Sequence, residues 1–255
     1  MKCNDIIALS ESWTDVNFDS DLCNFTCNNF YGKFRHRNAK RNSGGTVLYI
    51  RDSILPGVSI VKNEYDTLIW LKLDKTFFSF QSDIYLCCLY LWRHDSPVSR
   101  IVDVDLFDVI SEDVLYFEQL GSVLLAGDWN ARVGKKIDYI DCDANVSNID
   151  DYEYLTDNPL GRASQDSVCN PRGIKMLDLC KSLSLRIANG RLGHDFNKGE
   201  LTYFSQHSQS IIDYLVLKES DFSLIHDYCI SDINSHSDHA PLYFTIFGRS
   251  VVYVE

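Results

Sequence analysis

A carboxylate and a carboxamide stand two residues apart where an apolar run of the chain ends. The run Val123–Ala126 has the length of a buried strand, and Gly127 breaks it just before Asp128 and Asn130. Asp128 can accept a proton or hold a water molecule, and Asn130 can donate and accept hydrogen bonds. On an extended backbone both side chains point the same way, with Trp129 turned away to pack. Since Gly, Asp and Asn also favour turns, a plain strand-to-loop connection is the alternative.

Other acidic and imidazole side chains follow or interrupt apolar segments in the same manner. Glu11 follows the apolar segment Ile6–Leu9, where a simple turn carboxylate is the alternative. Asp213 lies inside an apolar strand-like segment, and a buried carboxylate needs a partner. An imidazole would satisfy it, so we expect His239 beside Asp213, with His236 as the alternative partner or as an ordinary loop histidine.

Length and composition limit the class of protein. The 255 residues, 45% hydrophobic and 13% aromatic, suit one large domain, and no linker-like shift in composition divides them. No apolar run approaches the roughly 18 residues of a membrane helix, and no signal segment is evident. The nine cysteines lack zinc-site spacing and are expected to be reduced. We therefore expect an intracellular protein, in nucleus or cytoplasm, without a membrane partner.

The formal net charge of −12 argues against binding to nucleic acid through overall charge. One local segment is basic and directly precedes Gly44 and Gly45. It is either a solvated loop or a phosphate-contacting loop, and we favour the second interpretation. Its basic residues are Lys33, Arg35, His36, Arg37, Lys40 and Arg41.

Many short strands and two helices are needed to position these side chains. Helical spacing predicts a helix within Arg100–Leu120 and a second one that begins at Asn170-Pro171. Ser82–Leu91 is apolar on both faces and therefore indicates a central strand. The polar stretch Ala131–Asn170 is a long loop, of a length that is functional or disordered. Further strands are expected at Thr46–Ile50, Thr67–Leu73, Leu185–Ala188, Leu201–Phe204, Ile211–Leu217, Tyr228–Ile230 and Leu242–Phe247. This pattern favours two sheets packed face to face over a regular doubly wound sheet.

A series of short motifs runs along nearly the whole chain. In chain order they are Ile7–Trp13 (IALSESW), Gly44–Val47 (GGTV), Leu89-Tyr90, Gly127–Ala131 (GDWNA), Asn170–Gly173 (NPRG), Ile187–Arg191 (IANGR), Leu201–Ser205 (LTYFS), Ser210–Tyr214 (SIIDY) and Ser237–His239 (SDH). Each is weak alone, but the ordered set is specific. The chain resembles the endonuclease/exonuclease/phosphatase superfamily of metal-dependent phosphoesterases. Within that superfamily it looks most like the apurinic-type endonuclease domain of non-LTR (LINE-type) retrotransposons.

The resemblance implies a fold, an activity and partners. The fold is a four-layered α/β-sandwich, two packed mixed β-sheets flanked by helices, over residues 1–255. The activity is that of a metal-dependent phosphodiesterase, a DNA-nicking endonuclease of retrotransposon type. It implies Mg²⁺ as the cofactor, with Mn²⁺ as an alternative, and DNA as the partner of a monomer. In the full element a reverse transcriptase would follow downstream.

The resemblance also implies roles for individual residues. Asp128 would orient or deprotonate the attacking water, and Asn130 would hold that water or a phosphate oxygen. His239, oriented by Asp213, would stabilise charge on the phosphate, and Tyr90 would donate to the phosphate or the leaving oxygen. Metal ligation falls to Glu11 and Asp238. Substrate contacts fall to Thr202, Ser210, Arg35, Arg37 and Lys40.

One departure keeps enzymatic activity open. Family members begin with a strand carrying an Asn upstream of the Glu, whereas this sequence starts only ten residues before Glu11. We therefore expect that strand to be missing and the segment Asp5–Leu9 to lie at an exposed, unpaired edge. Two alternatives follow: a catalytically impaired, truncated remnant that is no enzyme, or a phosphatase of the same superfamily acting on lipid or inositol phosphates.

Overall fold

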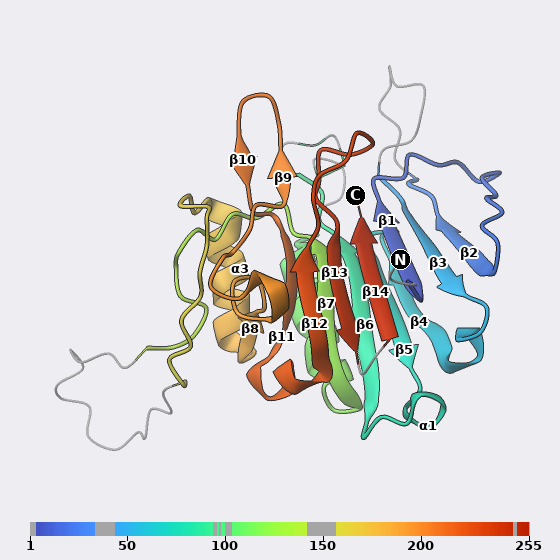
Figure 1. Ribbon diagram of the computed structural model, residues 1–255, viewed down its shortest axis with the longest axis horizontal. Helices are drawn as coiled ribbons and strands as arrows, with labels where there is room; N and C mark the ends of the chain where they lie inside the picture. Colours follow the sequence, from blue (N-terminus) through green and yellow to red (C-terminus); the bar gives the residue numbers. More distant parts are fainter. Residues whose placement is uncertain are drawn as a thin grey trace.

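Two six-stranded β-sheets pack face to face in the computed structural model, which describes residues 4–33, 44–93, 96, 98–99, 104–141, 157–246 and 249–254 (Figure 1). The first sheet consists of β1 (Ile6–Ser10), β2 (Phe25–Phe30), β3 (Thr46–Arg51), β12 (Ile225–Ile230), β13 (Leu242–Ile246) and β14 (Arg249–Val254). Their order across the sheet is β12-β13-β14-β1-β3-β2. The pair β1–β14 is parallel and the other neighbours are antiparallel, so the sheet is mixed.

The second sheet has the order β4-β5-β6-β7-β11-β8. Its strands are β4 (Val58–Glu64), β5 (Leu68–Leu73), β6 (Asp83–Tyr90), β7 (Gly121–Asp128), β8 (Leu185–Ile187) and β11 (Asp213–Lys218). Here β6 and β7 form the parallel pair, and α2 (Leu106–Phe117) is the crossover between them. The remaining elements are α1 (Lys75–Phe78), α3 (Pro171–Ser182), the short strands β9 (Tyr203–Phe204) and β10 (Gln209–Ser210), and 3₁₀ turns at Leu55–Gly57, Gly193–Asp195 and Glu219–Leu224.

Two apolar cores hold the layers together. One lies between the sheets and contains Ile6, Leu48, Leu86, Leu215 and Phe244, all at most 2% exposed. The other lies between the second sheet and the two 12-residue helices α2 and α3, which cover its outer face. The fold is thus the α/β-sandwich of two mixed sheets that the sequence predicts.

The two predicted helices begin at caps that the sequence supplies. The Asp105 carboxylate accepts a hydrogen bond from the amide of Phe107 at the start of α2. Asn170 does the same for the amide of Gly173 at 2.7 Å, and Pro171 occupies the first turn of α3. Gly173 is required here because a Cβ would lie 1.8 Å from the carbonyl oxygen of Arg132. This close approach ties the loop after β7 to the start of α3.

The predicted strands are confirmed to within a few residues at their ends, and β6 is central and buried on both faces. Four strands were not expected: β2, β4, β10 and β14. The strands β2 and β4 lie at sheet edges, and their sequences FTCNNF and VSIVKNE lack a clear apolar alternation. The described parts of 131–170 form no strand or helix beyond one isolated bridge, between Val133 and Cys169.

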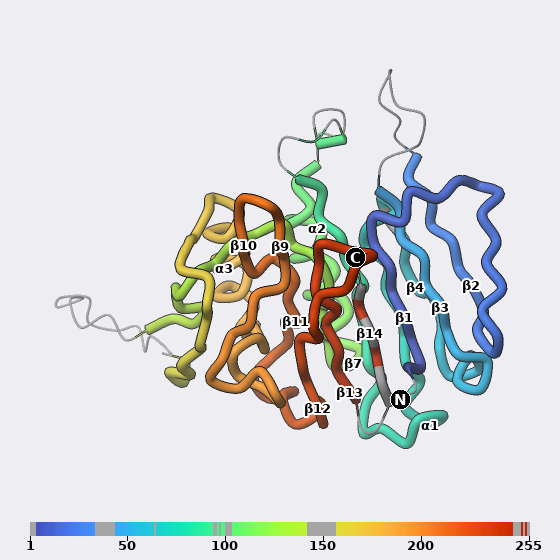
Figure 2. Tube along the Cα trace, turned by 45° about the horizontal axis from the view of Figure 1, so that its top comes forward, coloured from blue at the N-terminus to red at the C-terminus, as the bar shows by residue number. Residues whose placement is uncertain are grey.

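The expectation of an unpaired edge at Asp5–Leu9 is wrong. The strand β1 pairs with β3 on one side and with β14 on the other, in the register Ile6 to Val251 and Leu9 to Val254. Figure 2 shows the blue tube of β1 beside the red segment of β14. A strand from late in the sequence therefore saturates the backbone groups that we expected to be free.

Two further findings bear on the composition. No helix in the described part of the chain is long and apolar enough to cross a membrane. All seven cysteines among the described residues are free.

Candidate active site

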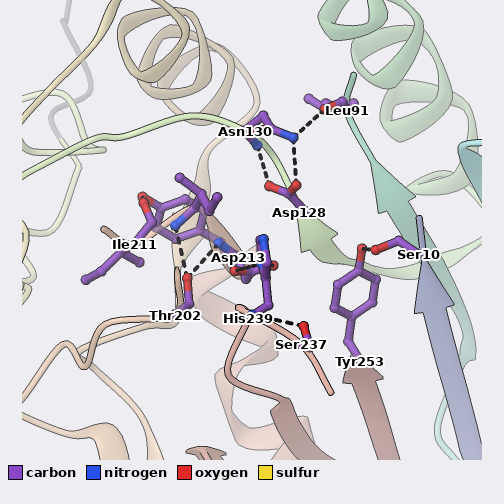
Figure 3. Close-up of polar contacts among 12 residues, drawn as sticks. Ser10, Leu91, Asp128, Asn130, Thr202, Ile211, Asp213, Ser237, His239 and Tyr253 are labelled. Carbon is purple, nitrogen blue, oxygen red and sulfur yellow. Dashed lines mark hydrogen bonds and ion pairs between the residues drawn. The ribbon is translucent and has the colours of Figure 1, made fainter. Parts of the chain in front are cut away.

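Asp128 and Asn130 contact each other directly at the end of β7 (Figure 3). The Asn130 amide donates to Asp128 Oδ1 and its side-chain nitrogen donates to Asp128 Oδ2, both at 2.6 Å. The same nitrogen donates to the carbonyl of Leu91 at 2.9 Å. The two side chains meet because Asn130 adopts a left-handed φ of 45°, and not through the extended alternation that we expected. Trp129 turns away and is fully buried, as predicted.

Asp213 and His239 form a buried pair one strand away. His239 Nδ1 lies 2.9 Å and 3.1 Å from the two carboxylate oxygens of Asp213, and His239 is only 6% exposed. Burial opposes a charge on the imidazole, but the Asp213 carboxylate outweighs it and raises the pKa of His239 to about 9. The negative charges of Asp128 and Asp238 act in the same direction. At neutral pH this raised pKa favours the imidazolium form of His239, with Nδ1 facing Asp213.

The pair is further fixed by its surroundings. The His239 amide donates to the Ser237 hydroxyl at 2.9 Å. The Tyr203 ring lies against the imidazole, with ring centroids 4.9 Å apart. The packing of Tyr203 on His239 was not predicted. The LTYFS motif marked this segment as part of the site, but nothing in the sequence indicated a role for its tyrosine.

Glu11 and Tyr90 meet across the two sheets. The Tyr90 hydroxyl, from the end of β6, donates to Glu11 Oε1 just beyond the end of β1. Glu11 has a left-handed φ of 46°, uncommon for a residue with a side chain, and the amides after it are held by the carbonyls of Gly45 and Gly44.

The register of neighbouring strands connects the three contacts Asp128–Asn130, Asp213–His239 and Glu11–Tyr90. In the second sheet Tyr90 is the register partner of Asp128 on the neighbouring strand, and Asp128 is the partner of Asp213 on the next. Tyr90 and Asp128 end their strands and Asp213 begins its strand, so the three residues lie at the same end of neighbouring strands. The chain of neighbours therefore runs from Glu11 through Tyr90, Asp128 and Asp213 to His239.

A half-buried arginine supports the loops on both sides of Asp128. Arg172, on α3, donates to the carbonyl of Trp92 at 2.6 Å and to that of Trp129 at 3.4 Å. Its guanidinium lies 5.7 Å from the centre of the Phe107 ring. Burial lowers the pKa of Arg172, and the charge of Asp128 partly offsets this. The sequence places Arg172 in the NPRG motif, but nothing in its residue type reveals this bridging role.

Thr202 and Ser210 do not lie on the surface of the site. Thr202 is fully buried, and its hydroxyl accepts hydrogen bonds from the amides of Ile212 and Asp213, both at 3.1 Å. Ser210 is 4% exposed, and its carbonyl accepts from the Thr202 amide. Both residues are buried, and their expected contact with substrate stays a prediction. Figure 3 shows Thr202 beside the start of β11, where it holds Asp213 in place.

The other expected contacts are only partly described. Asp238 is exposed next to His239, and its carbonyl accepts from the amide of Phe204. Lys33 pairs with Asp66 at 3.1 Å and is largely exposed. The predicted substrate contacts Arg35, Arg37 and Lys40 lie outside the described residues.

The donor set fits a divalent ion that keeps most of its water. Among the described residues no three His, Cys, Asp or Glu side chains are grouped to enclose a metal. Glu11 is half-buried and offers a single carboxylate. Mg²⁺ usually binds through one or two carboxylates and retains several waters. A carboxylate at the rim of the site therefore suits Mg²⁺ better than Zn²⁺, which needs three or four protein ligands.

Comparison with known proteins identifies the fold. No protein-family model matches the chain, and no curated protein matches it. The AP endonuclease LMAP from Leishmania major superposes with a TM-score of 0.64 and 14% identity, over 94% of this chain and 77% of that one. The 3′ phosphatase NExo from Neisseria, bound to product DNA hairpin, gives 0.59 and 13%, over 95% and 88%.

A third structure is the endonuclease domain of TRAS1, a telomere-specific non-LTR retrotransposon, with a TM-score of 0.49 and 14% identity over 86% and 78% of the two chains. The first two show that the chain has the endonuclease/exonuclease/phosphatase fold.

Proposed function

We propose that this chain is a metal-dependent phosphodiesterase that hydrolyses DNA, and more narrowly an endonuclease that nicks DNA and leaves a 3′-hydroxyl. The fold is shared with an AP endonuclease and with an enzyme solved with product DNA. The narrower assignment to a retrotransposon type is supported by the ordered motifs from IALSESW to SDH. We further propose that residues 1–255 act as one domain, which the shared core between the two sheets supports.

The observation that carries the proposal is the Asp213–His239 pair, whose Oδ2 and Nδ1 atoms lie 2.9 Å apart at the end of the sheet where Asp128 also lies. Because Asp213 engages Nδ1 and raises the pKa of His239, the protonated imidazole can donate from Nε2 to a phosphoryl oxygen of the substrate. A cationic donor in a buried site stabilises negative charge that develops on a phosphoryl oxygen. Asp213 keeps the ring oriented and charged, so it acts through His239 and does not itself contact the phosphate.

Asp128 and Asn130 supply the complementary function. The carboxylate is 1% exposed and is held at both oxygens by Asn130, which is itself tethered to the Leu91 carbonyl. A carboxylate fixed in this way can orient a water molecule and accept its proton as the water attacks phosphorus. The fixed geometry removes the orientational entropy that a freely rotating carboxylate would lose.

Glu11 is the residue that we propose to hold the divalent ion, and the Tyr90 hydroxyl orients its carboxylate. A bound Mg²⁺ would neutralise charge on the phosphate and on the leaving oxygen. Tyr90 lies beside Asp128 in strand register, and its hydroxyl would donate to a phosphate oxygen only after releasing its one hydrogen from Glu11.

Nicking of supercoiled plasmid in the presence of Mg²⁺ tests the proposal. We compare the wild-type chain with Asp128→Ala and His239→Gln, and use His236→Gln as the matched control, because His236 is an exposed histidine three residues away. The expected loss is at least about 100-fold for each site variant. His236→Gln should retain full activity. Equal nicking by wild type and Asp128→Ala would show that the activity has another source.

A phosphatase is the second candidate, because the Neisseria relative of this fold is described as a 3′ phosphatase. Oligonucleotides with a 3′-phosphate end and a soluble inositol phosphate are offered in parallel assays. Turnover of either one without plasmid nicking would assign the site to phosphate monoesters. No turnover of any substrate with Mg²⁺ or Mn²⁺ would identify an inactive remnant.

A further inference from the structure

Tyr253, on β14, stands between the two sheets at the edge where the candidate active site lies (Figure 3). Its side chain is buried, with the residue 2% exposed. The hydroxyl donates to Ser10 Oγ at 2.6 Å and to the carbonyl of Leu89 at 3.0 Å. Ser10 belongs to the first sheet and Leu89 to the second, so one phenol bridges both layers.

The two hydrogen-bond partners directly precede residues of the proposed site. Ser10 precedes Glu11, and Leu89 precedes Tyr90. The Tyr253 ring also faces the strand that carries Asp128. A Cβ at Gly127 would lie 1.9 Å from the carbonyl oxygen of Leu89 and 3.0 Å from Tyr253 Cε2, so the glycine is required first by the close approach of β6 and also leaves room for the ring. The phenol therefore touches the backbone neighbours of three site residues, which lie on three different strands.

We propose that Tyr253 is a positioning residue that sets the distance between Glu11 on one sheet and Asp128 on the other. The proposal rests on the proposed function, because it assigns these two residues to one reaction. Tyr253 itself touches neither substrate nor ion.

The need for such a residue follows from how the layers are joined. Apolar contacts between stacked sheets are non-directional, so they resist separation more than they resist sliding. Catalytic groups on different layers must nevertheless be held to within about 0.5 Å. Tyr253 contacts Ser10 in its own sheet, just before Glu11, and Leu89 in the second sheet, just before Tyr90. These contacts restrict sliding of the two sheets next to the residues whose separation matters most for the reaction.

The matched pair Tyr253→Phe and Tyr228→Phe tests this role. Tyr228 is a fully buried tyrosine of the same sheet, and its hydroxyl has no hydrogen-bond partner among the residues that the structure describes. Both substitutions delete one buried hydroxyl and keep the ring. Ser10→Ala is the second variant, because it removes the Tyr253 contact within the first sheet and leaves the aromatic packing and the Leu89 contact to the second sheet in place.

Kinetics on a short DNA duplex with Mg²⁺ supply the first readout. We expect kcat to fall roughly tenfold in Tyr253→Phe, the effect of losing one well-formed hydrogen bond. The KM for DNA should stay within about twofold. The kcat of Tyr228→Phe should match that of the wild type. The double variant Ser10→Ala/Tyr253→Phe should lower kcat by less than the product of the two single fold-reductions. A kcat for Tyr253→Phe equal to that of Tyr228→Phe would overturn the proposal.

Hydrogen–deuterium exchange supplies a readout that needs no activity. Amides of residues 10–13 and 89–92 should exchange faster in Tyr253→Phe than in the wild type. In Tyr228→Phe they should exchange at the wild-type rate. If the wild type does not cleave DNA, the proposed function fails and the exchange data alone decide the bridging role of Tyr253. Unchanged exchange in both segments would refute that role in either case.

Discussion

Replacing Asp213 by Asn should remove a pH-dependent contribution to the stability of this protein. The pKa of His239 is about 9 in the fold against an ordinary 6.5. The difference corresponds to about 3 kcal/mol in favour of the protonated, folded form. Because the folded-state pKa is the higher one, this stabilisation is complete below about pH 6.5 and is lost as the pH rises to about 9. In Asp213→Asn the opposing effect of burial remains without its counter-charge, so the contribution disappears.

The assay is urea unfolding of the wild type and of Asp213→Asn at pH 6 and at pH 9.5. Between these two pH values the wild type should lose about 3 kcal/mol more than the variant. Other groups titrate in both proteins and cancel in the comparison. Asp232→Asn, which removes an exposed carboxylate, should behave as the wild type does. NMR of the His239 ring protons gives the midpoint directly. An identical loss of stability in wild type and Asp213→Asn would refute the assignment of the charged pair.

Three further substitutions have separate expected outcomes. Thr202→Val keeps the side-chain shape but leaves the amides of Ile212 and Asp213 without their acceptor. It should lower the free energy of unfolding in urea by about 1–3 kcal/mol, and Thr202→Ser should lower it less. Equal urea midpoints for the two variants would contradict this. Asp138→Asn leaves the buried Arg191 guanidinium without its bidentate carboxylate. It should lower the free energy of unfolding by about 3–5 kcal/mol, and a loss below about 1 kcal/mol would contradict this role of Asp138. Arg172→Lys cannot reach both the Trp92 and Trp129 carbonyls and should slow plasmid nicking roughly tenfold with little change in KM, whereas unchanged nicking would leave Arg172 a purely structural role.

Residue types and their order were sufficient for most of the framework. The strand β6 is apolar on both faces because it lies between β5 and β7 and is covered on both sides, so its central place could be read directly. The cap Asn170 and Pro171 mark the start of α3 through local chemistry alone. The pairing of Asp213 with His239 was predictable because a buried carboxylate must be satisfied.

What the sequence left undetermined depends on non-local contacts and on backbone conformation. The burial of Thr202 depends on the β9–β10 segment folding over the start of β11, which no property of threonine reveals. The meeting of Asn130 with Asp128 depends on a left-handed φ, which asparagine permits but does not require. The strand β14 pairs with the preceding β13 and also with Ile6–Leu9, more than 200 residues away, and the sequence does not reveal this second, non-local contact.

The place of β14 also orders events during synthesis. The strand β1 is synthesised before residues 249–254, so the flank of β1 that pairs with β14 can be filled only after residue 254 has left the exit tunnel. Until then the nascent chain carries an open strand edge next to Glu11, and such edges are where newly made chains associate wrongly. Production of this protein should therefore depend on how well residues 6–10 are shielded until residues 249–254 have been translated.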